Sequence, residues 1–327
     1  MTGSRRFPRE QSASRDISTR ATLGAPCLDP ETWEALIPIH HFLVRALLFL
    51  VTAIFAHAQQ PAITFTPANV EAGSPELLRI AASGITSADG EWLGRKIQFF
   101  PSHDHHAWLA LAGVDVEAAA GPSTLTLHLH TANNTTHDIT QSIDVHPAHY
   151  RTGILTVSPK FVSPGPDELK QIEADSKIKQ EAFASSATEP LWSGSFHAPV
   201  QSPPTDSFGT RRTFNGKLAS IHKGMDFRAP MGTLVRASNS GTVVLARPLY
   251  YEGNCVIIDH GLGLYTVSMH FSRIDVHEGQ HVNTGDPLGL SGATGRVTGP
   301  HLHWAVRWQG AYLDPAKLLR LTLPTHP

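Results

Sequence analysis

The sequence predicts a mainly β protein in which a short helix joins two β-rich halves. Short runs of alternating apolar and polar residues recur over residues 62–157 and again over residues 206–315, between residue types that favour turns. Between the halves, apolar residues follow helical spacing after Pro166. The chain has 327 residues, of which 41% are hydrophobic. That composition is sufficient for two domains of ordinary size, each with a core.

The first half is predicted to be a small β-sandwich spanning residues 59–157. Its alternating runs include Ile63–Thr66, Trp108–Gly113 and Thr124–His130. Because side chains point to opposite faces along a strand, this alternation places one face of each sheet in the core and the other in water.

Residues 158–205 are predicted to form a helical connector and a linker. Leu169, Ile172, Ile178 and Phe183 recur at helical spacing among charged residues. The following segment, residues 193–204, is rich in serine and proline, and proline disfavours a helix there.

The second half, residues 206–327, is predicted to be a compact antiparallel sheet. Its strand-like runs are separated by turns that contain glycine. The runs are Thr242–Ala246, Cys255–Ile258, Tyr265–Met269, Pro287–Leu290 and His301–Val306.

An apolar segment near the N-terminus is typical of a secretory signal peptide. The run Leu43–Phe55, with Arg45 near its start, is followed by Ala56-His57-Ala58, a small-x-small cleavage pattern. It is shorter than the roughly 20 residues of a transmembrane helix, so no stable membrane anchor is expected after cleavage. We expect residues 43–58 to be the signal peptide, residues 1–42 to be a gene-model extension or disordered, and the mature protein to be periplasmic or secreted.

The charge and cysteine content narrow the function. With 26 basic and 28 acidic residues the formal net charge is -2, which favours neither nucleic acid nor an anionic membrane as a partner. Two cysteines, Cys27 and Cys255, predict no disulfide framework, and Cys255 lies among β-formers as a buried strand residue would. The 20 histidines favour metal or acid–base chemistry, but they also make chance histidine motifs common.

Two segments of the second half together suggest a metal site. His222 and Asp226 are four residues apart with a glycine between them, and alternation on a strand points His301 and His303 to the same face. Zinc accepts imidazole nitrogen and carboxylate oxygen in a tetrahedron, and a catalytic site keeps one position open for water. Two histidines and one aspartate leave that position open.

These residues belong to a longer ordered pattern, which resembles the M23 peptidases of the lysostaphin type, also called LytM-like. The matching segments are Ser207–Arg211, His222-x-Gly224-x-Asp226-Phe227, Ala229–Ala237, Gly241-x-Val243, Gly253-Asn254, Asp259–Gly263, Gly279–Gly285 and Gly292–His303. The resemblance implies that His222, Asp226 and His303 bind one zinc ion, and that His270 and His301 lie beside the metal as catalytic groups. It leaves open which of these two is the general base.

One position departs from the family pattern. Relatives often carry a tyrosine two residues before the histidine that matches His270, and Ser268 stands there. Tyr250 or Tyr251 could take over a role in binding the transition state.

Other histidine motifs have simpler interpretations. His277–His281 matches H-E-x-x-H, but it contains a glycine and precedes turn-forming residues, so a turn is predicted where that motif requires a helix. His128-Leu129-His130 is predicted to lie on a solvent-facing strand, His103–His106 in a polar loop, and His260 in a turn with a structural role.

The resemblance implies a secreted zinc endopeptidase that cuts peptidoglycan. A non-catalytic activator of a cell-wall amidase and a peptidase of glycine-rich proteins remain alternatives. The first half faintly resembles, around Leu109–Asp115, the β-sandwich that precedes the peptidase in many M23 proteins. It could bind wall polymer, cover the groove or act as a spacer, and the sequence does not indicate an oligomeric state.

Overall fold

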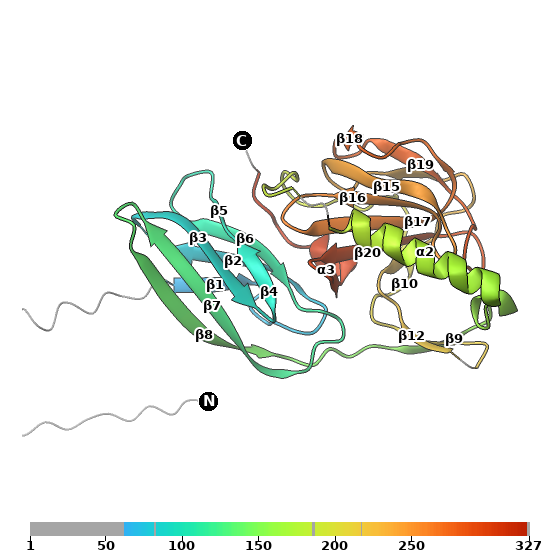
Figure 1. Cartoon of the computed structure of the whole chain (residues 1–327), viewed down its shortest axis with the longest axis horizontal. Coiled ribbons are helices and arrows are strands. Elements are labelled where there is room, and N and C mark those ends of the chain that lie inside the picture. The colour runs from blue at the N-terminus through green and yellow to red at the C-terminus, as the bar shows by residue number, and fades with distance from the viewer. Residues whose placement is uncertain (1–61, 82, 185–186, 217, 326–327) are drawn as a thin grey trace, which may run out of the picture. The chain divides into compact units, whose positions relative to one another are not determined.

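The computed structural model describes residues 62–325, without residues 82, 185–186 and 217 (Figure 1). The predicted signal peptide, the segment before it and Cys27 lie outside the described residues. No helix among residues 62–325, the gaps excepted, is long and apolar enough to cross a membrane.

The first half and the connector contain the following elements. They are β1 (Ala62–Thr66), β2 (Pro75–Ala81), β3 (Ile85–Trp92), β4 (Arg95–Gln98), β5 (Phe100–Pro101), β6 (Trp108–Gly113), β7 (Gly121–Thr131), β8 (Thr136–Val145), β9 (Thr152–Leu155), the 3-10 helix η2 (Pro159–Phe161) and α2 (Pro166–Ala182).

The second half is built from shorter strands and one terminal helical turn. Its elements are β10 (Pro204–Asp206), β11 (Arg211–Phe214), β12 (Leu218–Ile221), β13 (Met225–Phe227), β14 (Leu234–Arg236), β15 (Gly241–Leu249), β16 (Gly253–Asp259), β17 (Leu264–Ile274), β18 (His281–Val282), β19 (Pro287–Ser291), β20 (Leu302–Trp308), β21 (Ala311–Leu313) and α3 (Pro315–Leu318).

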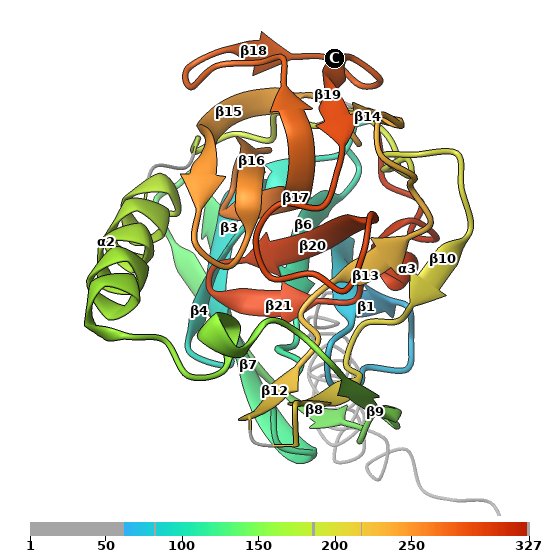
Figure 2. The same ribbon diagram turned by 90° about the vertical axis from the view of Figure 1, so that its right-hand side faces the viewer.

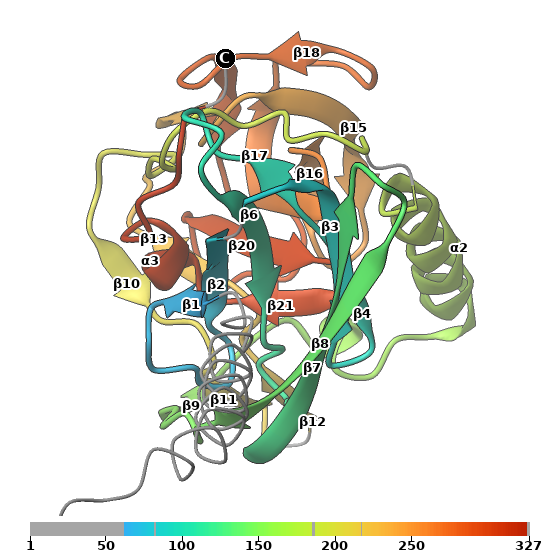
Figure 3. The ribbon, with the colours of Figure 1, turned by 90° about the vertical axis from the view of Figure 1, so that its left-hand side faces the viewer.

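Two four-stranded antiparallel sheets make the predicted β-sandwich. One has the order β1-β2-β6-β5 and the other β4-β3-β7-β8 (Figure 3). Strand β7 shows why the sequence folds this way, since Leu125, Leu127 and Leu129 are buried while His128 and His130 between and after them are partly exposed. The alternation read from the sequence therefore corresponds to the core and solvent faces of one sheet.

The second half is organised around a ten-stranded sheet. Its main path has the order β10-β13-β20-β17-β16-β15-β18, and β14, β19 and β21 pair beside it (Figure 2). The central strands β16, β17 and β20 are almost wholly buried because both of their faces are covered. Cys255 lies in β16 and is fully buried, as predicted.

The predicted connector helix is α2, which covers one face of this sheet (Figure 1). Its last residue, Ala182, joins a buried cluster with Leu245, Cys255, Tyr265 and Ala305. The helix begins with a proline at its first turn, where the missing N–H has no intrahelical partner to lose.

The sandwich packs on the second half through β6 and the segment around β21. A Cβ at Gly113 would lie 2.5 Å from the Leu313 side chain, so the two halves approach too closely for any larger residue there. The Asp115 carboxylate accepts a hydrogen bond from the Tyr312 backbone at 2.8 Å, and Lys317 pairs with Glu71. Buried residues of both halves form one continuous hydrophobic cluster.

A small sheet was not anticipated from the sequence. Strand β9, within the range predicted for the sandwich, pairs in parallel with β11, and β11 pairs with β12. Parallel pairing between segments some 60 residues apart has no local sequence signal.

The remaining histidine motifs lie where the sequence predicts. His277–His281 forms a turn that leads into β18, and its Glu278 pairs with Arg247 at 2.6 Å. His128 and His130 bond the carboxylates of Asp138 and Asp89, both at 2.7 Å. Residues 103–106 lie in an exposed turn.

Candidate metal centre

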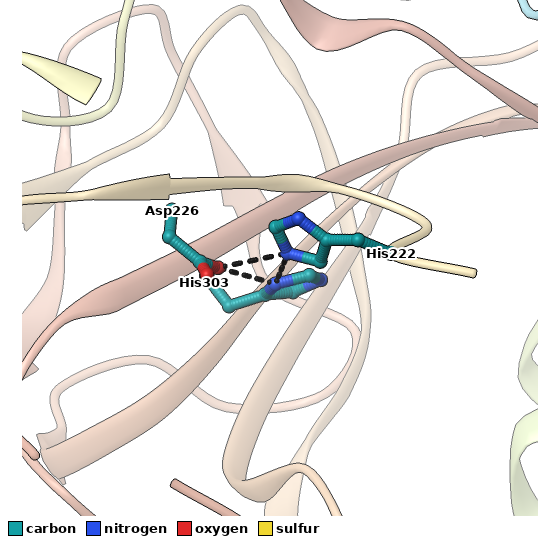
Figure 4. A group of neighbouring side chains, drawn as sticks. All are labelled: His222, Asp226 and His303. Carbon is teal, nitrogen blue, oxygen red and sulfur yellow. Dashed lines mark hydrogen bonds and ion pairs between the residues drawn. The ribbon is translucent and has the colours of Figure 1, made fainter. Parts of the chain in front are cut away.

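Three donor atoms from two neighbouring strands and one loop meet at a single point. Asp226 on β13 and His303 on β20 are directly paired in register, and His222 lies just before β13. His222 Nε2 is 3.0 Å from both Asp226 Oδ1 and His303 Nδ1, and the last two atoms are 2.8 Å apart (Figure 4). The predicted ligand set is therefore brought together in space.

The donor set fits a tetrahedral cation. Ligands at about 2.0–2.1 Å from zinc at tetrahedral angles lie about 3.3 Å from one another, close to these separations. His222 Nδ1 lies 2.9 Å from the Ser207 carbonyl oxygen, so it carries the proton and Nε2 keeps its lone pair. Three lone pairs then face one another at short range, an arrangement that a bound cation stabilises.

The protonation states also suit metal binding. Burial lowers the pKa of His303 to about 4, against the attraction of Asp226, so the ring is neutral near pH 7. Burial raises the pKa of the Asp226 carboxyl, but contacts with His222 and His303 outweigh it and hold the pKa well below its usual value. Both side chains thus present free lone pairs.

The second oxygen of Asp226 is held by an arginine. Arg212 Nη2 donates to Asp226 Oδ2 at 2.7 Å and to Asp206 Oδ2 at 2.5 Å. Arg212 and Asp226 are both nearly buried. This charge-assisted contact fixes the carboxylate so that only Oδ1 faces the other donors.

Gly224 allows the close approach of the third ligand. A Cβ at this position would lie 2.5 Å from His303 Nε2 and 2.7 Å from the Trp304 carbonyl oxygen. Any larger side chain would push His303 away from His222 and Asp226.

His270 and His301 lie beside the three donors, as predicted. Their ring centroids are 5.0 Å apart, and the His270 ring is 6.1 Å from that of His303. His270 Nδ1 lies 2.8 Å from the Thr294 carbonyl oxygen, and His301 Nδ1 lies 2.8 Å from that of Gly299. Each ring therefore donates through Nδ1, which leaves Nε2 as the nitrogen available for other contacts.

The two rings differ in environment. His270 is buried with a φ of +69°, a backbone conformation that is uncommon outside glycine. Burial, followed by the charges of His303 and His301, lowers its pKa to about 3. His301 keeps a side-chain exposure of 20%, and its Nε2 is 3.8 Å from Asp226 Oδ1. His301 is thus the more accessible of the two.

A cavity of about 690 Å³ opens onto these residues. Its lining includes all five histidine and aspartate residues of the site. Further walls come from Leu155, Phe214, Tyr251, Met269 and Arg296. Its volume falls within the roughly 300–1,000 Å³ that is typical of ligand sites.

The two tyrosines considered from the sequence occupy different places. Tyr251 lines the cavity, whereas the Tyr250 hydroxyl donates to the Lys160 carbonyl at 2.9 Å. Ser268 is buried in β17. Of the two tyrosines, Tyr251 is therefore the one placed to contact a bound substrate.

The sequence did not predict several residues that orient the donors. Asp206 and Arg212 flank the matched segment Ser207–Arg211, but the ion pairs that Arg212 makes with Asp206 and Asp226 depend on tertiary contacts. The carbonyl oxygens that orient His222 and His270 carry no residue-type signal at all. His260 has a structural role as predicted: it is fully buried and bonds the Ser240 carbonyl and the Thr266 hydroxyl.

Residues 220–315 match the model of peptidase family M23. The chain carries an M23 peptidase domain. The matched segment includes the three donors and both neighbouring histidines.

Curated relatives that match the M23 domain are named as DD-peptidases. The peptidoglycan DD-endopeptidase ShyA of Vibrio cholerae is 44% identical over 108 residues, which are 33% of this chain and 24% of that protein. The DD-carboxypeptidase/endopeptidase Mpg of Neisseria meningitidis is 40% identical over 105 residues, 32% of this chain and 24% of that protein. The match thus spans about a quarter of either relative.

A solved structure extends the likeness beyond the M23 domain. The crystal structure of a putative M23 peptidase from Pseudomonas aeruginosa superposes with a TM-score of 0.58 at 27% identity. It covers 76% of this chain and 94% of that chain, so the likeness reaches well outside residues 220–315.

Proposed function

We propose that this protein is a zinc-dependent endopeptidase that hydrolyses peptide bonds in peptidoglycan. The observation that carries the proposal is the convergence of His222 Nε2, Asp226 Oδ1 and His303 Nδ1 within 3.0 Å of one another at a solvent-accessible cavity. Three ligands and an open side are the arrangement of a catalytic zinc site.

The three donors would hold the zinc ion, with Ser207 and Arg212 orienting His222 and Asp226. When bound there, zinc supplies Lewis acidity, which polarises the scissile carbonyl and makes a water molecule more acidic. As ligands, the Asp226 carboxylate would supply one negative charge and the two imidazoles would supply nitrogen lone pairs, a donor set that suits a divalent cation.

His301 is proposed to take the proton of the attacking water. Its Nδ1 donates to the Gly299 carbonyl oxygen, and its Nε2 lies 3.8 Å from Asp226 Oδ1 on a side chain that is 20% exposed. The water oxygen forms a bond to the carbonyl carbon, the carbon–nitrogen bond breaks, and His301 passes the proton to the leaving amine. His270 is buried with its ring centroid 5.0 Å from that of His301, and we propose that it positions the His301 ring.

Peptidoglycan is proposed as the substrate because relatives of this domain in Vibrio cholerae are named peptidoglycan DD-endopeptidases. The cell envelope is then the place of action, periplasmic or outside the cell, and residues 43–58 are proposed as the signal peptide that leads there. We propose residues 59–157 as the sandwich domain, 158–205 as the connector and 206–327 as the peptidase domain.

Two rival functions remain testable. A non-catalytic activator of a cell-wall amidase would not need a complete ligand set, and His222, Asp226, His303, His270 and His301 are all in place. A peptidase of glycine-rich proteins would use the same site to cleave a different substrate.

The deciding experiment incubates the purified protein with peptidoglycan sacculi and, separately, with a glycine-rich protein. The expected result is release of muropeptides with new amino termini, abolished by a chelator and restored by zinc. No cleavage of sacculi in the presence of zinc would overturn the proposal. Cleavage of the glycine-rich protein alone would favour the second rival, and stimulation of an added amidase without cleavage would favour the first.

A further inference from the structure

One charged side chain at the cavity differs from the others. Apart from histidines, the lining contains Glu117, Asp206, Arg212, Lys223, Asp226, Glu252 and Arg296. Glu117 pairs with Lys223 at 3.0 Å, Arg212 with both aspartates, and Glu252 with Lys179. Within the described part of the chain, Arg296 forms no ion pair and no side-chain hydrogen bond. Its guanidinium donors are therefore available to a ligand.

Two aromatic rings hold this guanidinium in place. The Cζ atom of Arg296 lies 4.6 Å from the ring centroid of Phe214 and 4.6 Å from that of Tyr251. The backbone N–H of Arg296 donates to the Tyr251 carbonyl at 2.8 Å. Contact with two rings restrains the guanidinium, while its N–H groups remain without a hydrogen-bond partner among the described residues.

The side chain is only partly exposed, and burial lowers the pKa of its guanidinium. That shift reports a desolvation cost for the cation, and a nearby anion would offset it. The remaining acidic groups of the cavity already have cationic partners. Among the described residues, Arg296 is thus the lining cation without an ion-pair partner, although the charge of Glu252 acts on it from beyond ion-pair distance.

Arg296 is also close to the reacting groups. The carbonyl oxygen of Thr294 accepts the hydrogen bond from His270 Nδ1. Thr294 is two residues before Arg296, so the Cα atoms of Thr294 and Arg296 are at most about 7 Å apart. Gly295 between them has a φ of +76°, and a Cβ there would lie 2.3 Å from the Gly253 backbone nitrogen. The segment that positions His270 is therefore the one that positions Arg296.

We propose that Arg296 binds the free carboxylate on the leaving-group side of the scissile bond. The inference rests on the proposed function and names its substrate class. In a D,D-peptide bond the amide nitrogen is attached to a D-configured carbon that also bears a carboxyl group, whether the bond is a cross-link or the chain terminus. The planar fork of an arginine matches that carboxylate with two parallel hydrogen bonds.

The test uses two synthetic peptides with one D-alanyl-D-amino acid bond, identical except that the leaving-side carboxyl group is free or a primary amide. The zinc-loaded protein is expected to cleave the acid with a kcat/KM about tenfold to hundredfold above that of the amide, the range for hydrogen bonds to a charged group. Arg296→Met is expected to lose this preference through slower cleavage of the acid, with the amide unchanged. Arg296→Lys should retain part of it.

Arg307→Met is the matched control. Arg307 is also half-buried and stacked on an aromatic ring, 4.0 Å from the Phe183 centroid, but it does not line the cavity. This variant should keep the acid-over-amide ratio of the parent protein.

Two results would overturn the inference. One is equal cleavage of acid and amide by the parent protein, and the other is an equal loss on both peptides in Arg296→Met, which indicates a structural role only. If the zinc-loaded parent cleaves neither peptide, the proposed function fails. Calorimetric binding of the same two peptides then decides the inference separately: a preference for the acid that Arg296→Met abolishes supports it, and equal binding contradicts it.

Discussion

Arg212 donates to Oδ2 of Asp226 while Oδ1 of the same carboxylate faces His222 and His303. The two oxygens thus have separate roles, one oriented by an arginine and one free to bind a cation. Oriented carboxylates of this kind raise metal affinity because the ligand loses less freedom on binding.

Replacing this arginine should weaken the metal site without removing a ligand. For Arg212→Met we expect zinc affinity to fall about tenfold to hundredfold, the range for lost partners of metal ligands. Competition with a chromophoric chelator measures it. The matched control is Arg247→Met, which breaks an exposed pair with Glu278 far from the cavity lining. An unchanged zinc affinity in Arg212→Met would contradict the role of Arg212 in orienting Asp226.

The two histidines beside the donors should affect rate and not metal content. For His301→Gln we expect a fall in kcat of about 10²–10⁴, the usual contribution of a general acid–base group, with zinc still bound. His270→Gln should give a smaller loss, because His270 is buried and acts through His301 in this account. Loss of zinc in His301→Gln, or a larger defect in His270→Gln, would contradict the assignment.

Buried His260 should make folding sensitive to acid. Burial lowers its pKa to about 4, whereas the unfolded chain takes up the proton near 6.5. Between these values the unfolded state binds more protons, so the free energy of unfolding falls as pH falls from 7 to 4. Over this range the free energy of unfolding of His260→Gln should fall by up to about 3 kcal/mol less than that of the parent protein. Urea unfolding of both proteins at pH 7 and pH 4.5 measures this difference. An equal change in the free energy of unfolding of parent and variant would refute the prediction.

Buried Glu76 in the sandwich should give the free energy of unfolding the opposite pH dependence, with stability falling as pH rises. It is fully buried beside Ser74, its Oε2 has no hydrogen-bond partner among the described residues, and burial raises its pKa to about 8. The folded state therefore keeps the proton above the unfolded pKa of 4.5, and the free energy of unfolding falls as pH rises through that window toward 8.

Glu76→Gln should be insensitive to that change. Between pH 6 and pH 8 the free energy of unfolding of the parent is expected to fall by roughly 2 kcal/mol relative to that of this variant. Exposed Glu91→Gln serves as the control. A parent protein whose stability does not fall over this interval would contradict the buried, protonated state of Glu76.

The sequence predicts the β-sandwich and the connector helix from local signals, whereas the roles of the five site residues follow from the resemblance to M23 peptidases. Alternation at Leu125, Leu127 and Leu129 gives the sandwich strand its buried face. The spacing of His301 and His303 places two imidazoles at one site. These features depend on strand periodicity, which neighbouring residues determine.

What the sequence does not predict depends on contacts between distant segments. The parallel pairing of β9 with β11 and the Arg212–Asp226 ion pair join residues that no local pattern relates. Arg296 lies inside a recognised segment, yet its unpaired charge becomes apparent only when the partners of the other charged groups are known.

The most direct test of the account is the metal content of the purified protein. Elemental analysis after dialysis against metal-free buffer should find one zinc per chain, and His303→Ala, which removes a donor 2.8 Å from Asp226, should lose it. Absence of stoichiometric metal from the folded parent protein, or full retention of zinc in His303→Ala, would contradict the central claim.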